Sequence, residues 1–160
     1  VLPYDIPFLK ETIHKTFYGK REARQVYLEE LEGWSNSIVC TTAEQADFVR
    51  KFLQVVEQNL DREDLGSTFV AEQMLMSPRQ FYRKLKEISG MSPSDLIKDY
   101  RMEKAARLLR DEALSIQEVI ADVGISSRAY FYKEFTRKFG MTPKVYREKT
   151  LENDGRKGRE

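Results

Sequence analysis

The 160-residue sequence has one cysteine, Cys40, and one histidine, His14, and this scarcity excludes several kinds of site. A structural zinc centre needs about four Cys or His ligands, and a disulfide framework needs paired cysteines, so neither fits. The sequence also lacks a glycine-rich phosphate loop and any run of about 18 apolar residues that could span a membrane. We therefore expect no enzyme activity, no metal, no cofactor and no membrane contact, and the single free thiol is typical of the cytoplasm.

The net charge of +1 conceals an uneven distribution of charge along the chain. Residues 1–66 carry a net charge of −4, and residues 67–160 carry a net charge of +5. A basic half favours binding to nucleic acid or another polyanion, although an ordinary solvated surface explains the same excess. Because the first residue is Val1 rather than Met, we expect a fragment or a processed protein.

Helical signals dominate the sequence from residue 41 onward. Thr41–Glu44 has the pattern of a capping box, and the helix expected after it extends to about Leu60. Its apolar positions recur on one face: Phe48, Phe52, Val55, Val56 and Leu60. Ser and Thr capping residues, Pro at first helical positions and Gly at the ends predict further helices at 67–74, 78–89, 93–110, 116–123, 127–139 and from 143.

The two ends of the chain give weaker signals. Residues 20–34 have the apolar spacing of a short amphipathic helix, and residues 35–43 are typical of a linker. The last ten residues, 151–160, are expected to be disordered. We therefore predict three parts: an N-terminal extension and linker at 1–43, a helical domain at 44–150 and a C-terminal tail.

An internal repeat is present in the predicted helical domain. A shift of 50 residues aligns Phe81-Tyr82 with Phe131-Tyr132, and Gly90–Pro93 with Gly140–Pro143. A shift of 49 aligns the apolar positions upstream, so each repeat is a short helix, a tight turn and a second helix. We therefore expect an all-α fold with two helix-turn-helix subdomains joined by a long linker helix and preceded by a partly helical extension.

The second helix of each repeat is expected to expose basic residues opposite a buried apolar stripe. The buried positions are Phe81, Leu85 and Ile88 in the first repeat, and Phe131, Phe135 and Phe139 in the second. The opposite faces carry Arg79, Arg83 and Lys86, and Ala129, Lys133, Thr136 and Arg137. Such helices suit the DNA major groove, where Arg pairs with guanine and capped helix N-termini bind phosphates.

The linker helix predicts a spacing for the two basic helices. Roughly 17 residues rise about 26 Å, which suits two helices inserted in successive major grooves about 34 Å apart.

Residues 48–148 resemble the AraC/XylS family of bacterial transcription regulators. The motifs that carry the resemblance are Arg101–Leu109, Ile116, Val123-Gly124-Ile125, Phe131, Phe135 and Phe139–Pro143. The resemblance implies a DNA-binding domain with these base-contacting positions: Arg79, Tyr82, Arg83, Arg128, Ala129, Tyr132 and Lys133. Four of these residues, Arg79, Arg83, Ala129 and Lys133, also lie on the helix faces opposite the expected buried stripes. The assignment of the tyrosines and Arg128 depends more on the resemblance.

Polar and basic residues around the same helices are expected to contact DNA phosphates. They are Ser77, Lys84, Lys86, Ser126, Ser127, Thr136 and Arg137.

Two positions depart from the family pattern. The first turn has Leu75 where the family usually has Gly, which costs roughly 1 kcal/mol if the position needs a positive φ, and a different first turn is one outcome. The second repeat has Ile120 where the family usually has a small Ala, which is expected to alter helix packing.

The N-terminal segment also resembles the end of a receiver domain, through Pro3-Tyr4-Asp5, Phe8-Leu9 and Ile13. The receiver pattern has Lys before the Pro, whereas this chain has Leu2, and a family-specific N-terminal arm is the alternative. The receiver interpretation implies a response regulator or a hybrid two-component sensor whose phosphoacceptor Asp lies upstream.

These features bear on three classes of function. A sequence-specific transcription regulator that binds double-stranded DNA fits best, with a homodimer, an upstream receiver or sensor region and RNA polymerase as expected partners. A helix-turn-helix module that binds protein instead predicts apolar or acidic exposed helices. An enzyme is disfavoured because the Asp and Glu side chains of this chain are expected on solvated helix faces.

Overall fold

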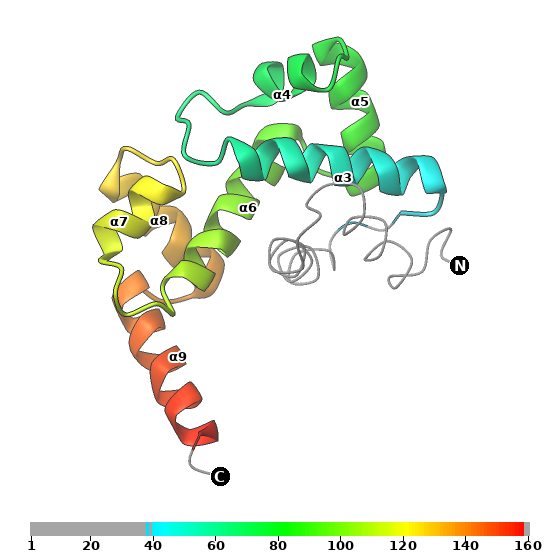
Figure 1. The fold of residues 1–160 in the computed structure, drawn as a ribbon. Helices are drawn as coiled ribbons and strands as arrows, with labels where there is room; N and C mark the ends of the chain where they lie inside the picture. The colour runs from blue at the N-terminus through cyan, green and yellow to red at the C-terminus, as the bar shows by residue number, and fades with distance from the viewer. Residues whose placement is uncertain (1–37, 39, 159–160) are drawn as a thin grey trace. The chain divides into compact units, whose positions relative to one another are not determined.

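A computed structural model of the chain describes residue 38 and residues 40–158 (Figure 1). In this part of the chain the secondary structure is entirely helical, with α3 at Ala43–Gln58 as the first helix. The predicted helix at 20–34, most of the linker and the receiver-like residues lie outside the described residues. The described residues divide into a first unit that contains residues 38, 40–58 and 66–96, and a second unit that contains residues 59–65 and 97–158.

The first unit packs α3 against a helix-turn-helix pair, α4 at Ser67–Gln73 and α5 at Pro78–Ser89 (Figure 1). The ring centres of Phe48 and Phe52 on α3 lie 6.1 and 5.9 Å, respectively, from the ring centre of Phe81 on α5. Phe52, Phe81 and Leu85 are fully buried, as the apolar spacing of both helices predicts. This core holds α5 with its opposite face toward solvent.

The second unit repeats the arrangement with α7 at Ile116–Asp122 and α8 at Arg128–Phe139. It also contains most of α6 at Pro93–Leu108, and α9 at Pro143–Lys157. Phe131 and Phe135 are fully buried. The centre of the Phe135 ring lies 4.5 Å from the ring centre of Phe139 and 5.3 Å from that of Tyr146. Aromatic packing therefore attaches α8 to α9.

The same backbone hydrogen bonds close both turns. In the first turn, Leu75 N–H donates to Glu72 O at 3.0 Å and Met76 N–H donates to Ala71 O at 2.9 Å. The equivalent bonds of the second turn, at 2.9 and 3.2 Å, run from Gly124 to Ala121 and from Ile125 to Ile120. Leu75 adopts a φ of 57° and Gly124 a φ of 74°, so the first turn keeps the geometry of the second despite its leucine.

Most predicted helix boundaries are confirmed. Ser77 and Ser115 form capping boxes with Gln80 and Glu118, respectively. Other helices begin after Ser127 and Thr142, whose hydroxyls accept from backbone N–H groups, and Gly90 and Gly140 end helices in the left-handed region.

The start of α3 is one residue later than predicted. Thr42 caps the helix, because its hydroxyl accepts from Gln45 N–H at 3.1 Å. Gln45, rather than Glu44, returns to the chain before the helix and accepts from Thr41 N–H at 2.8 Å. Gln and Glu can both fill this position of a capping box, and the structure uses Gln45.

The C-terminal segment differs from its expected disorder, because α9 extends to Lys157. Residues 144–154 contain neither Pro nor Gly, so nothing in them ends the helix. The Thr150 hydroxyl also donates to the Tyr146 carbonyl at 2.9 Å, one turn earlier. The expectation of a short last helix followed by a disordered tail from residue 151 is therefore wrong as far as Lys157.

Candidate nucleic-acid interface

The N-terminal half of α5 forms a basic exposed face in the first unit. Ser77 caps the helix and Pro78 occupies its first position, with Gln80 completing the capping box. Arg79 and Arg83 are exposed, as their positions opposite Phe81 predict. These side chains lie where a helix docked in a groove would meet base edges.

Tyr82 and Lys86 lie one helical turn apart on α5 and contact each other. The Lys86 ammonium lies 5.8 Å from the centre of the Tyr82 ring, and Tyr82 is 44% exposed. The predicted base-contacting Tyr82 and phosphate-contacting Lys86 are therefore neighbours at the surface of the first unit.

Lys84 has a different position from the other predicted phosphate contacts. Its ammonium forms an ion pair with Glu44 of α3 at 2.9 Å and lies 5.0 Å from the centre of the Phe48 ring. Because both partners belong to the same unit, Lys84 attaches α5 to α3. This interaction favours a structural role, and a phosphate that contacts Lys84 would have to share its ammonium with Glu44.

The N-terminus of α8 has a related arrangement in the second unit. The Ser127 hydroxyl accepts from Tyr130 N–H at 3.2 Å, and Ser126 before it is exposed. The Arg128 guanidinium lies 4.9 Å from the centre of the Tyr132 ring and donates to the Tyr132 hydroxyl at 2.9 Å. Two of the four residues of this unit that the resemblance assigned to base contact are therefore held together.

The remaining predicted contacts on α8 share its exposed side. Ala129, Lys133, Thr136 and Arg137 are all exposed. Arg137 nevertheless has a partner within its own helix, because two of its guanidinium nitrogens donate to the Glu134 carboxylate at 2.5 and 3.1 Å.

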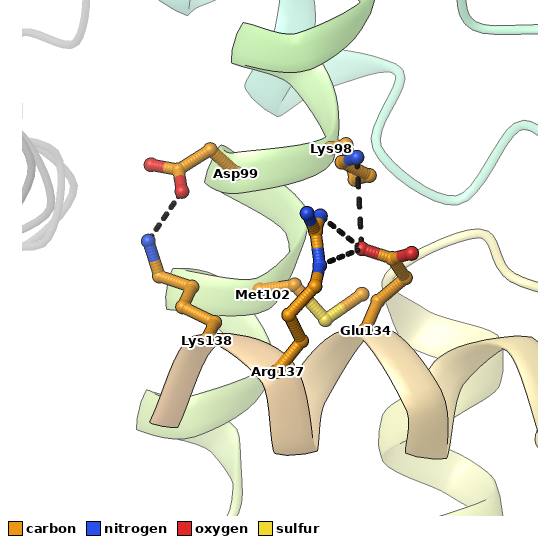
Figure 2. A pocket seen from close by; sticks show the side chains of 6 residues that line it. All are labelled: Lys98, Asp99, Met102, Glu134, Arg137 and Lys138. Atoms are coloured by element: carbon orange, nitrogen blue, oxygen red, sulfur yellow. Dashed lines mark hydrogen bonds and ion pairs between the residues drawn. The ribbon is translucent and has the colours of Figure 1, made fainter. Parts of the chain in front are cut away.

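Sequence reasoning missed the ionic cluster that surrounds Glu134. Figure 2 shows the Glu134 carboxylate between Arg137 of the same helix and Lys98 of α6, whose ammonium lies 3.5 Å away. The hydrogen bonds from Arg137 lower the pKa of Glu134, and the charge of Lys98 adds to this effect against the opposing influence of burial. The helical spacing of Glu134 and Arg137 is a usable signal for this pair.

A second interaction joins α6 to α8 in the same cluster. Lys138 forms an ion pair with Asp99 (Figure 2). It forms another with Glu103 at 3.1 Å. Burial lowers the pKa of Lys138, but the bonds and charges of the two carboxylates outweigh it and the net shift is upward. No sequence periodicity relates Lys138 to residues more than 30 positions earlier.

Two capped helices, each preceded by the same turn and each exposing basic side chains, define this chain as a helix-turn-helix protein. Among the residues that the structure describes, no helix is long and apolar enough to cross a membrane. The same residues contain no group of three His, Cys, Asp or Glu side chains that could hold a metal ion.

Comparison with known proteins identifies the family. The sequence profile described as "Helix-turn-helix domain" matches residues 70–149, which is half of the chain. The chain belongs to this AraC-type helix-turn-helix family of DNA-binding transcription regulators. The resemblance inferred from the sequence motifs and the all-α fold class are thereby confirmed.

Three similar proteins show the range of the family. "HTH-type transcriptional regulator GadX" of Escherichia coli O6:H1 is 36% identical over 83 residues, which are 52% of this chain and 30% of that protein. "Histidine kinase P4" of Formosa agariphila is 28% identical over 104 residues, which are 65% of this chain and 8% of that protein. The solved C-terminal domain of AraT, a response regulator from Geobacillus stearothermophilus, is 34% identical with a TM-score of 0.59, covering 64% of this chain and 84% of that one.

The chain therefore spans less than a third of the length of either curated relative. The similarity to the histidine kinase involves only a small part of that protein, and the family itself consists of transcription regulators rather than enzymes.

Proposed function

We propose that this chain is the sequence-specific DNA-binding part of a transcription regulator, with α5 and α8 as its two recognition helices. The observation that carries the proposal is a repeated arrangement. Each helix follows a turn with the same hydrogen bonds, begins at a serine cap and exposes cations opposite fully buried aromatic rings. A helix with these features fits the major groove and directs its N-terminal half toward base edges.

Base contacts are proposed for side chains near the start of each helix, all of which are exposed except the partly buried Tyr132. In the first unit Arg79 and Arg83 offer planar guanidinium groups that suit the two acceptors of guanine, with Tyr82 beside them. In the second unit the corresponding residues are Arg128, Ala129, Tyr132 and Lys133. The Ala129 methyl group suits an apolar contact with a thymine methyl.

Phosphate contacts are proposed for the residues that flank these positions. Backbone N–H groups at an N-terminus and exposed cations both favour an anion. The flanking residues are Ser77, Lys86, Ser126, Ser127, Thr136 and Arg137. Lys84 is the least suited of the predicted set, because its ammonium is paired with Glu44.

We further propose that the two recognition helices occupy successive major grooves. The linker helix α6 has 16 residues, which corresponds to a length of about 24 Å. Selection of bound duplexes from a random pool tests this directly. Two informative blocks about 10 base pairs apart are expected, and a single block would exclude insertion of both helices.

The signalling context is proposed from the relatives. Since AraT is described as a response regulator and the P4 protein as a histidine kinase, we propose that this chain is the output segment of a two-component protein. A homodimer and contact with RNA polymerase complete the proposal. Sedimentation of the full-length protein on a selected duplex, with and without phosphorylation, tests the two-component role and the homodimer.

The salt dependence of binding tests whether this chain binds DNA. Neutralising six or more phosphates should reduce the affinity for a selected duplex by roughly 10³-fold between 50 and 200 mM salt. Replacing Arg79 and Arg83 together with Ala should remove the base preference, whereas the matched control Lys149→Ala on exposed α9 should leave it unchanged. A flat salt dependence, or no binding to any duplex, would favour a protein-binding module instead.

A further inference from the structure

Glu134 is an acid on a helix whose exposed side is basic, and its environment is asymmetric. The Glu134 side chain is 11% exposed, whereas the Arg137 side chain that donates to it is 63% exposed. The pair borders a pocket of about 250 Å³ that Lys98, Met102 and Lys138 also line (Figure 2). The carboxylate is therefore held by its surroundings, while the guanidinium has room to turn away.

One carboxylate oxygen of Glu134 accepts both bonds from Arg137. The distances to Oε2 are 2.5 Å from Nη2 and 3.1 Å from Nε of Arg137, and Lys98 Nζ lies 3.5 Å from the same oxygen. If Arg137 leaves, Lys98 still compensates the charge of Glu134. The usual penalty for leaving a covered carboxylate unpaired is thereby reduced.

We propose that Glu134 is a positioning residue that restrains Arg137, so that this cation reaches a DNA phosphate only by exchanging its carboxylate partner for the phosphate. The inference rests on the proposed DNA-binding function. Glu134 thereby weakens sequence-independent attraction to DNA without touching a base, and Lys98 lowers the cost of the exchange.

Among the described residues of the first unit, no carboxylate pairs with Arg79 or Arg83 of the proposed recognition helix. The shift of 50 residues that aligns the repeats places Lys84, a cation, where α8 has Glu134. Lys84 is paired with Glu44 of α3, and Arg79 and Arg83 are exposed on the side of α5 opposite its buried residues. The restraint is thus specific to the second unit.

The test uses the Glu134→Gln variant, which keeps the size of the side chain and an acceptor oxygen but removes the charge. Affinity for a selected duplex and for an unrelated duplex should rise by the same factor, roughly two- to five-fold. The salt slope should stay close to the wild-type value, because Arg137 contacts the same phosphate in both complexes. Glu148→Gln on exposed α9 is the matched charge control and should have a smaller effect.

A double-mutant cycle with Arg137→Ala separates the restraint from general charge. The gain from Glu134→Gln should disappear when Arg137 is absent. An equal gain in both backgrounds overturns the inference, and so does a loss of affinity in a variant that unfolds at the wild-type temperature. The nuclear magnetic resonance signal of Arg137 Nε–H supplies a second measurement on the unmodified chain. It should shift on duplex binding, and an unchanged signal in the saturated complex also overturns the inference.

Failure of the two proposals can be distinguished. If the wild-type chain binds no duplex at any salt concentration, the DNA-binding function fails and the restraint falls with it. If wild-type binding is steeply salt-dependent while Glu134→Gln matches wild type, only the restraint fails.

Discussion

The turns of the two helix-turn-helix units have the same geometry but differ in the residues that cover them. Leu75 in the first turn is 94% exposed, so its side chain meets no packed neighbour. Gly124 in the second turn lies under the chain, because a Cβ added there would be 2.3 Å from the Leu60 carbonyl oxygen and 3.1 Å from the Arg101 guanidinium. Both residues adopt positive φ, yet only the second position requires glycine for space as well as for conformation.

This difference separates two constraints that a sequence pattern combines. The hydrogen bonds of the turn require the left-handed backbone, which a leucine can adopt at a cost of roughly 1–2 kcal/mol. The segment at 59–65, which the Arg101 side chain holds through a 2.5 Å bond to the Arg62 carbonyl, adds the steric constraint in the second unit. A turn position without such a covering segment tolerates a side chain.

The largest expected effect is therefore at Gly124. Gly124→Ala combines an unfavourable φ with a collision against backbone, and should destabilise the second unit by about 2–5 kcal/mol. Urea unfolding followed by a probe in each unit should show the loss in the second unit. Gly140→Ala is the matched control, since Gly140 has a φ of 73° and nothing within 4 Å of an added Cβ. Equal losses for the two variants would remove the steric part of the explanation.

The proposed recognition helices are expected to give the next largest effect. Arg83→Ala should weaken binding by roughly 1–3 kcal/mol and relax the preference at one base pair. Lys86→Ala on the same helix should weaken binding to all duplexes alike and reduce the salt slope. Competition binding with single-base variants of the selected duplex measures both effects, and an unchanged base preference in Arg83→Ala would contradict its proposed contact.

Leu75→Gly should have a smaller effect, and in the opposite direction. The variant relieves the positive φ without loss of buried surface, but glycine costs additional backbone entropy, so a net gain of about 0.5–1 kcal/mol is expected. Thermal unfolding of the first unit measures this gain. A neutral or destabilising result would mean that Leu75 is not strained in its turn.

Acid should affect the second unit first, although the effect is expected to be the smallest. Glu134 in the second unit and Asp47 in the first both have pKa values below their ordinary values of 4.5 and 3.8. For Asp47, hydrogen bonds from Arg50 and Lys51 outweigh the upward influence of burial. A carboxyl group whose pKa is lower in the folded protein stabilises the fold at pH values above its ordinary pKa. This stabilisation is lost as the pH falls through the lowered pKa.

The second unit should consequently begin to lose stability as the pH falls toward 4.5, and the contribution of Asp47 should persist to lower pH. Urea midpoints measured between pH 7 and pH 3 test this order. Glu134→Gln should flatten the pH dependence of the second unit, and a dependence identical to wild type would exclude Glu134 as its source.

Much of the local structure could be predicted from the sequence, because local interactions specify it. Ser77 with Gln80, and Ser115 with Glu118, mark helix starts through bonds that span three residues. The repeat and the spacing of aromatic residues also predicted which side of α5 and α8 is buried. The prediction was wrong at the end of the chain, where α9 continues to Lys157.

The sequence established the helical class, the two repeats and the basic exposed sides of their second helices, since periodicity and capping act over a few residues. Packing alone brought Lys84 to Glu44, Lys138 to Asp99, and the Leu60 carbonyl to Gly124. The partners in these contacts are about 40 or more positions apart, so no local pattern could reveal them. The first two contacts pair the cations Lys84 and Lys138 with carboxylates, and the third leaves room only for glycine in the second turn.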